Sequence, residues 1–289
     1  MDIIRATTAG FCMGVSLALQ KLEEELTQSR NLANSRICTL GPIIHNPQVL
    51  ADFESKGVVC INNENEIGPD DRVLIRAHGV PQKTEAFLRT RGAAVRDATC
   101  PRVKKAQLSI ACATNKGATL LLFGESEHPE VRGLVSYAHG MSHIFSNESE
   151  IDSIELLPDS SYVLASQTTQ DREAFAAIME RLSKQLPKLV VLQTICDATK
   201  KRQEEARRIA RMVEAMVVVG GKQSGNTRRL AHLAAQAGID TFHVEDSSEM
   251  ARENFLKKNR IGLTAGASTP KSLIDEVENW LKNLANCSD

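Results

Sequence analysis

The stretch LFGESEHPE, residues 122–130, holds the pattern that decides the fold: an apolar strand that ends in glycine, a polar loop and the start of a helix. The same order recurs in LGPIIHNP at residues 40–47 and in VGGKQSGNT at residues 219–227. Short strands that alternate with helices are typical of α/β proteins with parallel sheets. We therefore expect an α/β fold in which one kind of module is used three times.

Three cysteines mark the same division of the chain. Cys12, Cys100 and Cys196 cut it into near-equal thirds, and each stands just ahead of a segment with helical character. The repetition predicts mainly parallel sheets around a pseudo-threefold axis. The predicted modules span residues 1–97, residues 98–193 and, with a C-terminal helix, residues 194–289.

The three repeated thiols indicate metal chemistry. A cysteine at a helix start lies near the positive end of the helix dipole, which favours the thiolate that ligates metals. Three such thiolates that meet on one axis would hold an iron–sulfur cluster and leave one iron without a protein ligand as the reactive position. Structural zinc is the alternative, although such sites normally have a fourth protein ligand. The chain has neither a C-x-x-C pair nor the close-packed cysteine run of ferredoxins.

The other four cysteines have a simpler interpretation. Cys38 and Cys60 lie in apolar runs that resemble strands, Cys112 lies on an expected helix, and Cys287 is in a polar tail. Buried cysteine commonly behaves as a small hydrophobe, and we expect this of the first three.

Composition narrows the class of protein. The chain has 289 residues, is 42% hydrophobic and 25% charged, and carries a formal net charge of −1. These values are typical of a globular protein, and they favour neither nucleic acid nor an anionic membrane as a partner. The N-terminus lacks the pattern of a signal peptide, and no apolar run approaches the ~18 residues of a membrane span. With an odd number of cysteines, seven, we expect a cytoplasmic protein without a disulfide framework.

Polar side chains gather in the loops where strands lead into helices. Parallel sheets bind ligands outside the carboxyl ends of their strands, and helix starts offer N–H groups to phosphate oxygens. A single loop histidine is usually solvated, but three histidines in equivalent loops favour a shared function. The predicted phosphate-binding side chains are His45, His78, His128, Ser224, Asn226 and Ser268.

Two further loop residues have both a structural and a functional interpretation. Glu130 either satisfies a helix dipole or donates a proton in the same cavity as the histidines, and Thr168 is either a helix cap or part of that site. The glycines at residues 220–225 match neither the G-x-G-x-x-G nor the P-loop pattern, so NAD or ATP binding has little support. The basic residues at 200–211 most simply form a solvated helix face, although a redox partner could dock there.

Nine motifs, in this order, make the chain resemble the 4-hydroxy-3-methylbut-2-enyl diphosphate reductase family of the methylerythritol phosphate pathway. Any one motif is weak, but nine in the family order are specific. The motifs are GFCMGV at 10–15, LGPIIHNP at 40–47, RAHGV at 76–80, DATCP at 97–101, EHPEV at 127–131, SQTT at 166–169, TICDAT at 194–199, SGNT at 224–227 and AGAS at 265–268.

The resemblance implies a site and a reaction. It implies a [4Fe–4S] cluster on Cys12, Cys100 and Cys196, with one iron that lacks a protein ligand. The cluster would reduce (E)-4-hydroxy-3-methylbut-2-enyl diphosphate by two electrons and remove its hydroxyl, which yields isopentenyl and dimethylallyl diphosphate. Glu130 matches the acid associated with proton delivery, and Thr168 matches a hydroxyl near the substrate alcohol. The residues that match the diphosphate site are His45, His78, His128, Ser224, Gly225, Asn226 and Ser268.

The resemblance also bears on partners and on departures from the family. It implies an allylic diphosphate as substrate and a reduced ferredoxin or flavodoxin-type protein as electron donor, with no nucleic acid and no membrane. Some relatives have serine where this chain has Gly225, which leaves only a backbone N–H for phosphate. A basic residue is frequent where this chain has Ser16. The rival hypotheses are a cluster-based redox sensor and a zinc-dependent hydrolase.

Overall fold

The computed structural model describes residues 1–29 and 35–286, and within them the strands form three separate four-stranded sheets. Neighbouring strands in these sheets are parallel. The predicted α/β class, with three modules built on parallel sheets, is therefore confirmed. The predicted tail cysteine, Cys287, lies outside the described residues.

The three sheets have the same strand order. The first sheet is β3 (Val58–Ile61), β2 (Ile37–Leu40), β4 (Arg72–Ile75) and β5 (Ala94–Asp97). The second sheet is β7 (Ser142–Phe145), β6 (Thr119–Phe123), β8 (Tyr162–Ser166) and β9 (Leu189–Val191). The third sheet is β11 (Asp240–Val244), β10 (Ala215–Val219), β12 (Arg260–Ala265) and β1 (Asp2–Arg5).

The helices of the described residues follow the strands in alternation. They are α1 (Met13–Ser29), α2 (Pro47–Ser55), α3 (Gln82–Thr90), α4 (Pro101–Thr114), α5 (Pro129–Val135), α6 (Arg172–Gln185), α7 (Asp197–Ala210), α8 (Gly225–Ala235) and α9 (Lys271–Asn286). Short 3-10 helices lie at Glu64–Glu66, Glu148–Ser153, Ser247–Glu249 and Arg252–Asn254.

One strand lies far from its sheet in sequence. The third sheet takes its fourth strand, β1, from the start of the chain, where it pairs with β12. In the other two sheets the equivalent edge strand, β5 or β9, is the last one in sequence. The repeated unit is thus four strands followed by a cysteine, and the third copy is completed by the N-terminus. The boundaries 1–97, 98–193 and 194–289 stay a prediction.

The strand–glycine–loop pattern forms the same local structure in each sheet. Gly41, Gly124 and Gly220 directly follow β2, β6 and β10. Each glycine N–H donates to the last residue of the neighbouring edge strand, at 2.7–2.8 Å. The strands therefore end at the same level, and the polar loops that follow lie at equivalent positions on the carboxyl edges of the sheets.

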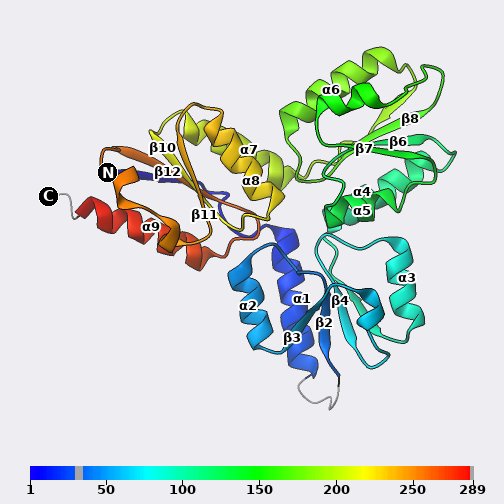
Figure 1. Ribbon diagram of the computed structural model, residues 1–289, viewed down its shortest axis with the longest axis horizontal. Coiled ribbons are helices and arrows are strands. Elements are labelled where there is room, and N and C mark those ends of the chain that lie inside the picture. Colours follow the sequence, from blue (N-terminus) through cyan, green and yellow to red (C-terminus); the bar gives the residue numbers. More distant parts are fainter. Residues whose placement is uncertain (30–34, 287–289) are drawn as a thin grey trace. The chain divides into compact units, whose positions relative to one another are not determined.

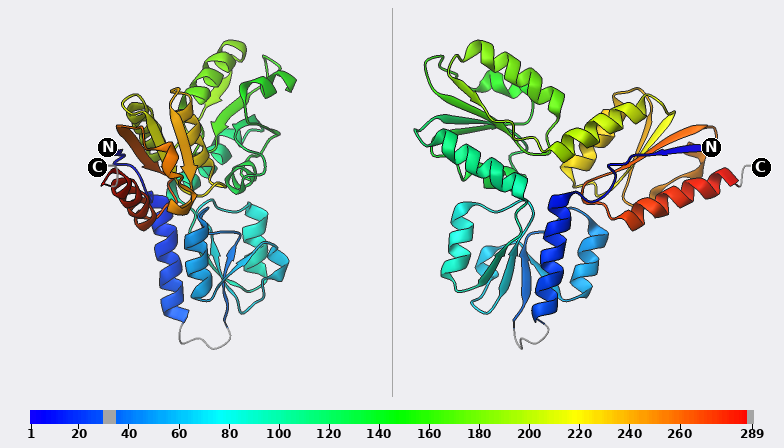
Figure 2. Two further views of the ribbon diagram at one scale, coloured as in Figure 1. Left: turned by 60° about the vertical axis from the view of Figure 1, so that its left-hand side comes forward. Right: turned by 180° about the vertical axis from the view of Figure 1, so that it is seen from behind.

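Helices cover both faces of the second and third sheets. In β6, Leu121 and Phe123 pack against α6, while Leu120 and Leu122 pack against α4 and α5, as the two-residue period of a strand requires. Figure 1 shows α6 on one side of this sheet and α4 and α5 on the other. In the third sheet, α9 covers one face and α7 and α8 cover the opposite face (Figure 2). Strands buried on both faces explain the continuous apolar runs in the sequence.

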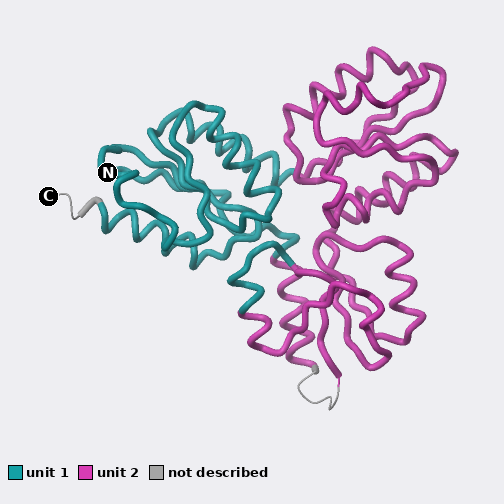
Figure 3. The backbone as a smooth tube through the Cα atoms, in the orientation of Figure 1, with its two compact units in different colours: residues 1–15, 44–51, 197–289 teal, residues 16–43, 52–196 magenta. Residues whose placement is uncertain are grey.

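The chain forms two compact units (Figure 3). The first unit contains the third sheet and consists of residues 1–15, 44–51 and 197–289. The second unit contains the first and second sheets and consists of residues 16–43 and 52–196. The predicted site residues are divided between these two units.

Candidate active site

Each predicted ligand cysteine stands directly before a helix, as the sequence indicates. Cys12 precedes α1, Cys100 precedes α4 and Cys196 precedes α7. Each follows the edge strand of a different sheet. Each backbone N–H donates to the carbonyl two residues beyond the neighbouring strand: Cys12 to Ala267 at 3.1 Å, Cys100 to Ala77 at 2.9 Å and Cys196 to Thr168 at 2.9 Å. One repeated hydrogen bond therefore positions all three thiols.

The chemistry of these three cysteines fits thiolate ligands of an iron–sulfur cluster. All three side chains are partly exposed, whereas Cys38 is fully buried and burial raises its pKa to about 11. Cys100 occupies the N-cap of α4 but its side chain makes no capping hydrogen bond, so the helix does not use the sulfur. Partly exposed thiols at helix starts can be reached by a metal, and the positive end of the helix dipole favours a negatively charged ligand there.

The other cysteines match their predicted role only in part. Cys38 is buried in the core of the first sheet, as expected. Cys60 is half-buried. Cys112 is exposed, so the prediction that it is a buried hydrophobe is wrong. It lies near the end of α4 on the side that faces away from the sheet, an orientation that the sequence pattern of this helix did not resolve.

Glu130 and Thr168 are in direct contact in the second unit. Glu130 is the second residue of α5, which follows β6, and Thr168 lies in the loop after the neighbouring strand, β8. The Thr168 N–H donates to Glu130 Oε1 at 2.6 Å, and the Thr168 hydroxyl donates to Oε2 at 3.0 Å. Glu130 is 2% exposed and Thr168 is 4% exposed. The pair is a buried carboxylate–hydroxyl unit at the carboxyl edge of the second sheet.

The purely structural role expected of each residue is wrong for Thr168 and holds in part for Glu130. The N-cap of α6 is Asp171, not Thr168, so the interpretation of Thr168 as a cap is wrong. Glu130 does lie in the first turn of α5, where the helix dipole favours a negative charge. Its carboxylate is nevertheless turned to Thr168, and the capping of α5 is done by His128.

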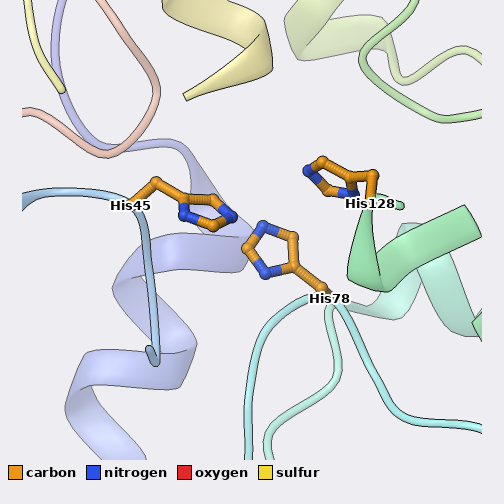
Figure 4. Close-up of side chains that lie close together, drawn as sticks. All are labelled: His45, His78 and His128. Atoms are coloured by element: carbon orange, nitrogen blue, oxygen red, sulfur yellow. The ribbon is translucent and has the colours of Figure 1, made fainter. Parts of the chain in front are cut away.

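His78 and His128 approach each other in the second unit. His78 lies in the loop after β4 of the first sheet, and His128 lies in the loop after β6 of the second sheet. Their ring centroids are 5.1 Å apart in an edge-to-face arrangement (Figure 4). The backbone N–H of Glu130 donates to His128 Nδ1 at 3.1 Å. Because Nδ1 is the acceptor, the neutral ring carries its proton on Nε2, which can donate to a ligand oxygen.

The first unit contributes His45 and the loops of the third sheet. His45 lies between β2 and α2, and its carbonyl accepts a hydrogen bond from the hydroxyl of Ser268 at 3.1 Å. Gly221 lies against the same carbonyl so closely that a side chain there would collide with it. The predicted residues His45 and Ser268 are thus neighbours in the structure.

The start of α8 carries the other predicted phosphate-binding residues of the first unit. Ser224 is the N-cap, and its hydroxyl oxygen accepts a hydrogen bond from the Thr227 N–H at 3.3 Å. Gly225 and Asn226 are the first two residues of the helix and are buried. Within the described residues, the buried Asn226 Nδ2 has no hydrogen-bond partner. An unsatisfied buried donor at a helix N-terminus is suited to an anionic ligand.

Two residues that the sequence does not single out hold the Cys12 loop. Glu205 of α7 accepts hydrogen bonds from the backbone N–H and the hydroxyl of both Thr7 and Thr8, at 2.7–3.0 Å. Arg202 of the same helix donates to the carbonyls of Thr8 and Gly10. Arg202 is 4% exposed, so the prediction of a solvated basic face at residues 200–211 is wrong at this position. No local signal marks these contacts, because the partners are almost 200 residues apart.

Within residues 1–29 and 35–286, none of the helices is both long enough and apolar enough to traverse a lipid bilayer.

Three equivalent parallel sheets, each with a cysteine and polar side chains at its carboxyl edge, define a three-module α/β protein that carries its candidate site residues on the loops after the strands. Comparison with known proteins identifies the family. The family model described as LytB protein matches residues 3–282, and this chain belongs to that family.

Close relatives carry one name. A protein of Desulfovibrio desulfuricans is 61% identical over 286 residues, covering 98% of this chain and 100% of the relative, and is called 4-hydroxy-3-methylbut-2-enyl diphosphate reductase. A protein of Aquifex aeolicus with the same name is 37% identical over 287 residues, covering 98% of this chain and 97% of the relative. The family resemblance seen in the sequence is therefore confirmed.

Solved structures agree with this result. The structure of the E-1-hydroxy-2-methyl-but-2-enyl-4-diphosphate reductase from Plasmodium falciparum has a TM-score of 0.92 at 25% identity, covering 98% of this chain and 88% of that one. A structure of (E)-4-hydroxy-3-methyl-but-2-enyl diphosphate reductase, described as the terminal enzyme of the non-mevalonate pathway, has a TM-score of 0.70 at 36% identity. It covers 98% of this chain and 100% of that one.

Proposed function

We propose that this LytB family member is a 4-hydroxy-3-methylbut-2-enyl diphosphate reductase of isoprenoid precursor biosynthesis. The reaction breaks the allylic C–O bond and consumes two electrons and two protons. One proton leaves with the hydroxyl as water, and the other adds to either end of the allylic unit, giving isopentenyl or dimethylallyl diphosphate. Support comes from the names of relatives that match along their whole length.

Cys12, Cys100 and Cys196 are the proposed ligands of a [4Fe–4S] cluster in which one iron lacks a protein ligand. When bound, the cluster supplies single electrons, which protein side chains cannot, and a Lewis-acidic iron for the reacting alcohol. The support from this chain is the repeated placement of three accessible thiols ahead of helices. The protein's own part is to fix the thiolates through the repeated backbone hydrogen bonds.

The proposed diphosphate site combines histidines with the start of α8. His128 would donate from Nε2, and Asn226 would donate from the side-chain N–H that is otherwise unsatisfied. Gly225 would offer only its backbone N–H. The Ser224 hydroxyl, whose oxygen accepts from the Thr227 N–H, would donate its proton to phosphate, and the Ser268 hydroxyl would turn from the His45 carbonyl toward phosphate. His45 and His78 complete the set. Fixing the diphosphate holds the alcohol in place and so lowers the entropic part of the barrier.

The contact between Glu130 and Thr168 is the observation that carries the proposal. A buried carboxyl with a hydroxyl 3.0 Å from Oε2 can hold a proton and release it through that hydroxyl. In the deprotonated state the Thr168 hydroxyl donates to Oε2; once Oε2 is protonated, the hydroxyl rotates to accept from it. The Thr168 hydroxyl then donates its own proton to the leaving hydroxyl. Such positioned proton transfer contributes roughly 10²–10⁴-fold to a rate.

The experiment uses the full chain, purified and reconstituted without oxygen and reduced chemically. Wild type should convert the hydroxylated diphosphate to both isomeric products. Glu130→Gln should keep iron content and substrate affinity while kcat falls at least about 100-fold, and Thr168→Val should behave similarly. Thr168→Ser, which keeps the hydroxyl, is the matched control and should retain most of the activity. Full activity in Glu130→Gln would remove this residue from the proton path.

The same experiment separates the rival classes. A zinc-dependent hydrolase would contain zinc and would lack the visible absorbance of an iron–sulfur cluster after purification without oxygen. A redox sensor would contain the cluster but form neither product. The reduced ferredoxin or flavodoxin-type donor and the cytoplasmic location remain part of the proposal.

A further inference from the structure

An open groove of about 630 Å³ lies in the second unit beside Cys100. It is formed by α1, by the end of β5 and the loop that follows it, and by α4 as far as Cys112. Its lining includes Thr99 and Pro101, the two sequence neighbours of Cys100. The groove therefore lies against the peptide segment that carries one proposed cluster ligand.

The groove is basic, in contrast to the chain as a whole. Lys21, Lys104 and Lys105 line it, with Asp97 as the single carboxylate, whereas the whole chain has a formal net charge of −1. Lys21 Nζ donates to the Asp97 carbonyl at 2.6 Å. Lys104 Nζ lies 3.5 Å from Asp97 Oδ2 and 3.4 Å from the Tyr137 hydroxyl. Two of the three ammonium groups are thus held in place, and the third, Lys105, is exposed.

The groove also presents apolar surface. Leu108 lies one turn beyond Lys104 on α4 and is 58% exposed, although it is a large hydrophobic residue. Cys112, a further turn along, is also exposed and lines the groove. A basic rim beside an exposed leucine suits a protein surface, because a small anion would use the lysines and leave Leu108 in water.

We propose that this groove is the docking site for an acidic electron-carrier protein, which would deliver electrons beside Cys100. The inference rests on the proposed function, because the chain needs such a partner only if it catalyses a reduction that consumes electrons. Each encounter oxidises the reduced carrier by one electron, and two encounters supply the two electrons of one turnover. Small, electrostatically guided interfaces are typical of such short-lived complexes.

The structure provides a matched control for the test. Helix α7 follows Cys196 as α4 follows Cys100, and the two helices share the local text VKKAQ and TKKRQ. Lys201 of α7 therefore corresponds to Lys105 of α4, and both are exposed. Lys105→Glu and Lys201→Glu make the same change in net charge at equivalent positions beside two different cysteines.

The experiment measures binding and turnover of the full chain with reduced flavodoxin as the probe. Lys105→Glu should weaken flavodoxin binding roughly tenfold at low salt and raise the KM for flavodoxin to a similar extent, while Lys201→Glu stays near wild type. The difference should fade between about 0.01 M and about 0.1 M salt, as the screening length drops from about 30 Å to about 10 Å. Turnover driven by reduced methyl viologen, which needs no protein docking, should be equal in all three proteins.

Several results would overturn the proposal. Wild-type flavodoxin binding in Lys105→Glu would do so, as would equal weakening in Lys201→Glu, because an effect of net charge would then be responsible. If Lys105→Glu weakened only the binding of inorganic phosphate, the groove would be a small-anion site. If it altered only the self-association of the chain, the groove would hold a second copy.

Two further controls complete the test. If the charge reversal in Lys105→Glu disturbs folding, Lys105→Gln and Leu108→Ser repeat the binding and turnover measurements with milder changes at exposed positions. A wild-type protein that turns over with neither reductant would refute the proposed function, while the binding measurement would still test the docking site.

Discussion

Glu205 holds the loop that carries Cys12, and its replacement by glutamine tests how firmly this proposed ligand is positioned. Both carboxylate oxygens accept from a threonine: Oε1 from the N–H and hydroxyl of Thr7, and Oε2 from those of Thr8. Oε1 also accepts from Arg208 at 3.4 Å. In Glu205→Gln one oxygen becomes an NH₂ group. Whichever way the amide is turned, its NH₂ group faces the N–H and the hydroxyl of one threonine. These two donors then lose their acceptor.

The magnitude follows from the pKa of Glu205. Burial raises this pKa, but the hydrogen bonds from Thr8 and Thr7 outweigh burial and lower it to about 2, from an ordinary value of 4.5. The side chain is 10% exposed, so solvent screening is limited. A difference of this size corresponds to at most about 3 kcal/mol of stability at neutral pH. Since part of the network survives in the amide, we expect Glu205→Gln to cost about 2 kcal/mol.

The pH dependence has a definite sign. Because the folded-state pKa is lower than the unfolded one, the contribution is complete above about pH 5 and is lost as the pH falls from there toward 2. The difference between wild type and Glu205→Gln should shrink by about 1 kcal/mol between about pH 7 and about pH 4. Glu204→Gln removes an exposed carboxylate from the same helix with the same change in net charge and is the matched control.

The assay is urea unfolding followed by the fluorescence of Trp280, the one tryptophan of the sequence. Trp280 packs edge to face on Phe255, with ring centroids 5.8 Å apart, and so reports on the third sheet of the same unit. Hydrogen exchange of the Thr7 and Thr8 amides provides a local measure, with protection expected to fall roughly 30-fold for 2 kcal/mol. A cost below about 0.5 kcal/mol, or one that does not change with pH, would refute the reasoning.

Three other substitutions have distinct expected results. Cys100→Ser should lose iron, sulfide and visible absorbance, whereas Cys38→Ala should keep all three; equal cluster content in both would exclude Cys100 as a ligand. Asn226→Ala should weaken substrate binding about tenfold in a calorimetric titration, since it removes a buried donor; unchanged affinity would exclude it from the diphosphate site. Gly266→Ala places a methyl group against the Thr227 side chain and should destabilise the protein by about 1–3 kcal/mol in urea; a neutral result would show that Thr227 moves aside.

Much of the local structure follows from the sequence because its determinants are local. The strand–glycine–loop pattern places Gly41, Gly124 and Gly220 directly after their strands, and the helices begin right after the three cysteines. Glycine, polar loops and helix starts act within a few residues of one another, so their order in the chain is enough. The threefold repetition of these signals also predicts three parallel-sheet modules.

Contacts between segments that are far apart in the sequence could not be predicted and are seen only in the tertiary structure. Nothing around Asp2–Arg5 shows that β1 pairs with β12, because parallel pairing is decided by long-range packing. For the same reason the sequence singles out Glu130 and Thr168 as separate residues, and only the adjacency of β6 and β8 makes them a hydrogen-bonded pair.

The burial of individual helix residues could not be predicted from the sequence either. Arg202 lies in a basic, polar stretch, yet it is buried because the Cys12 loop folds over it. Cys112 lies among apolar residues of α4, yet it is exposed. The sequence alone determined which residue types stand at strand ends and helix starts, since these depend on neighbours in the chain. The tertiary structure decided which of them meet, since that depends on how sheets and helices pack.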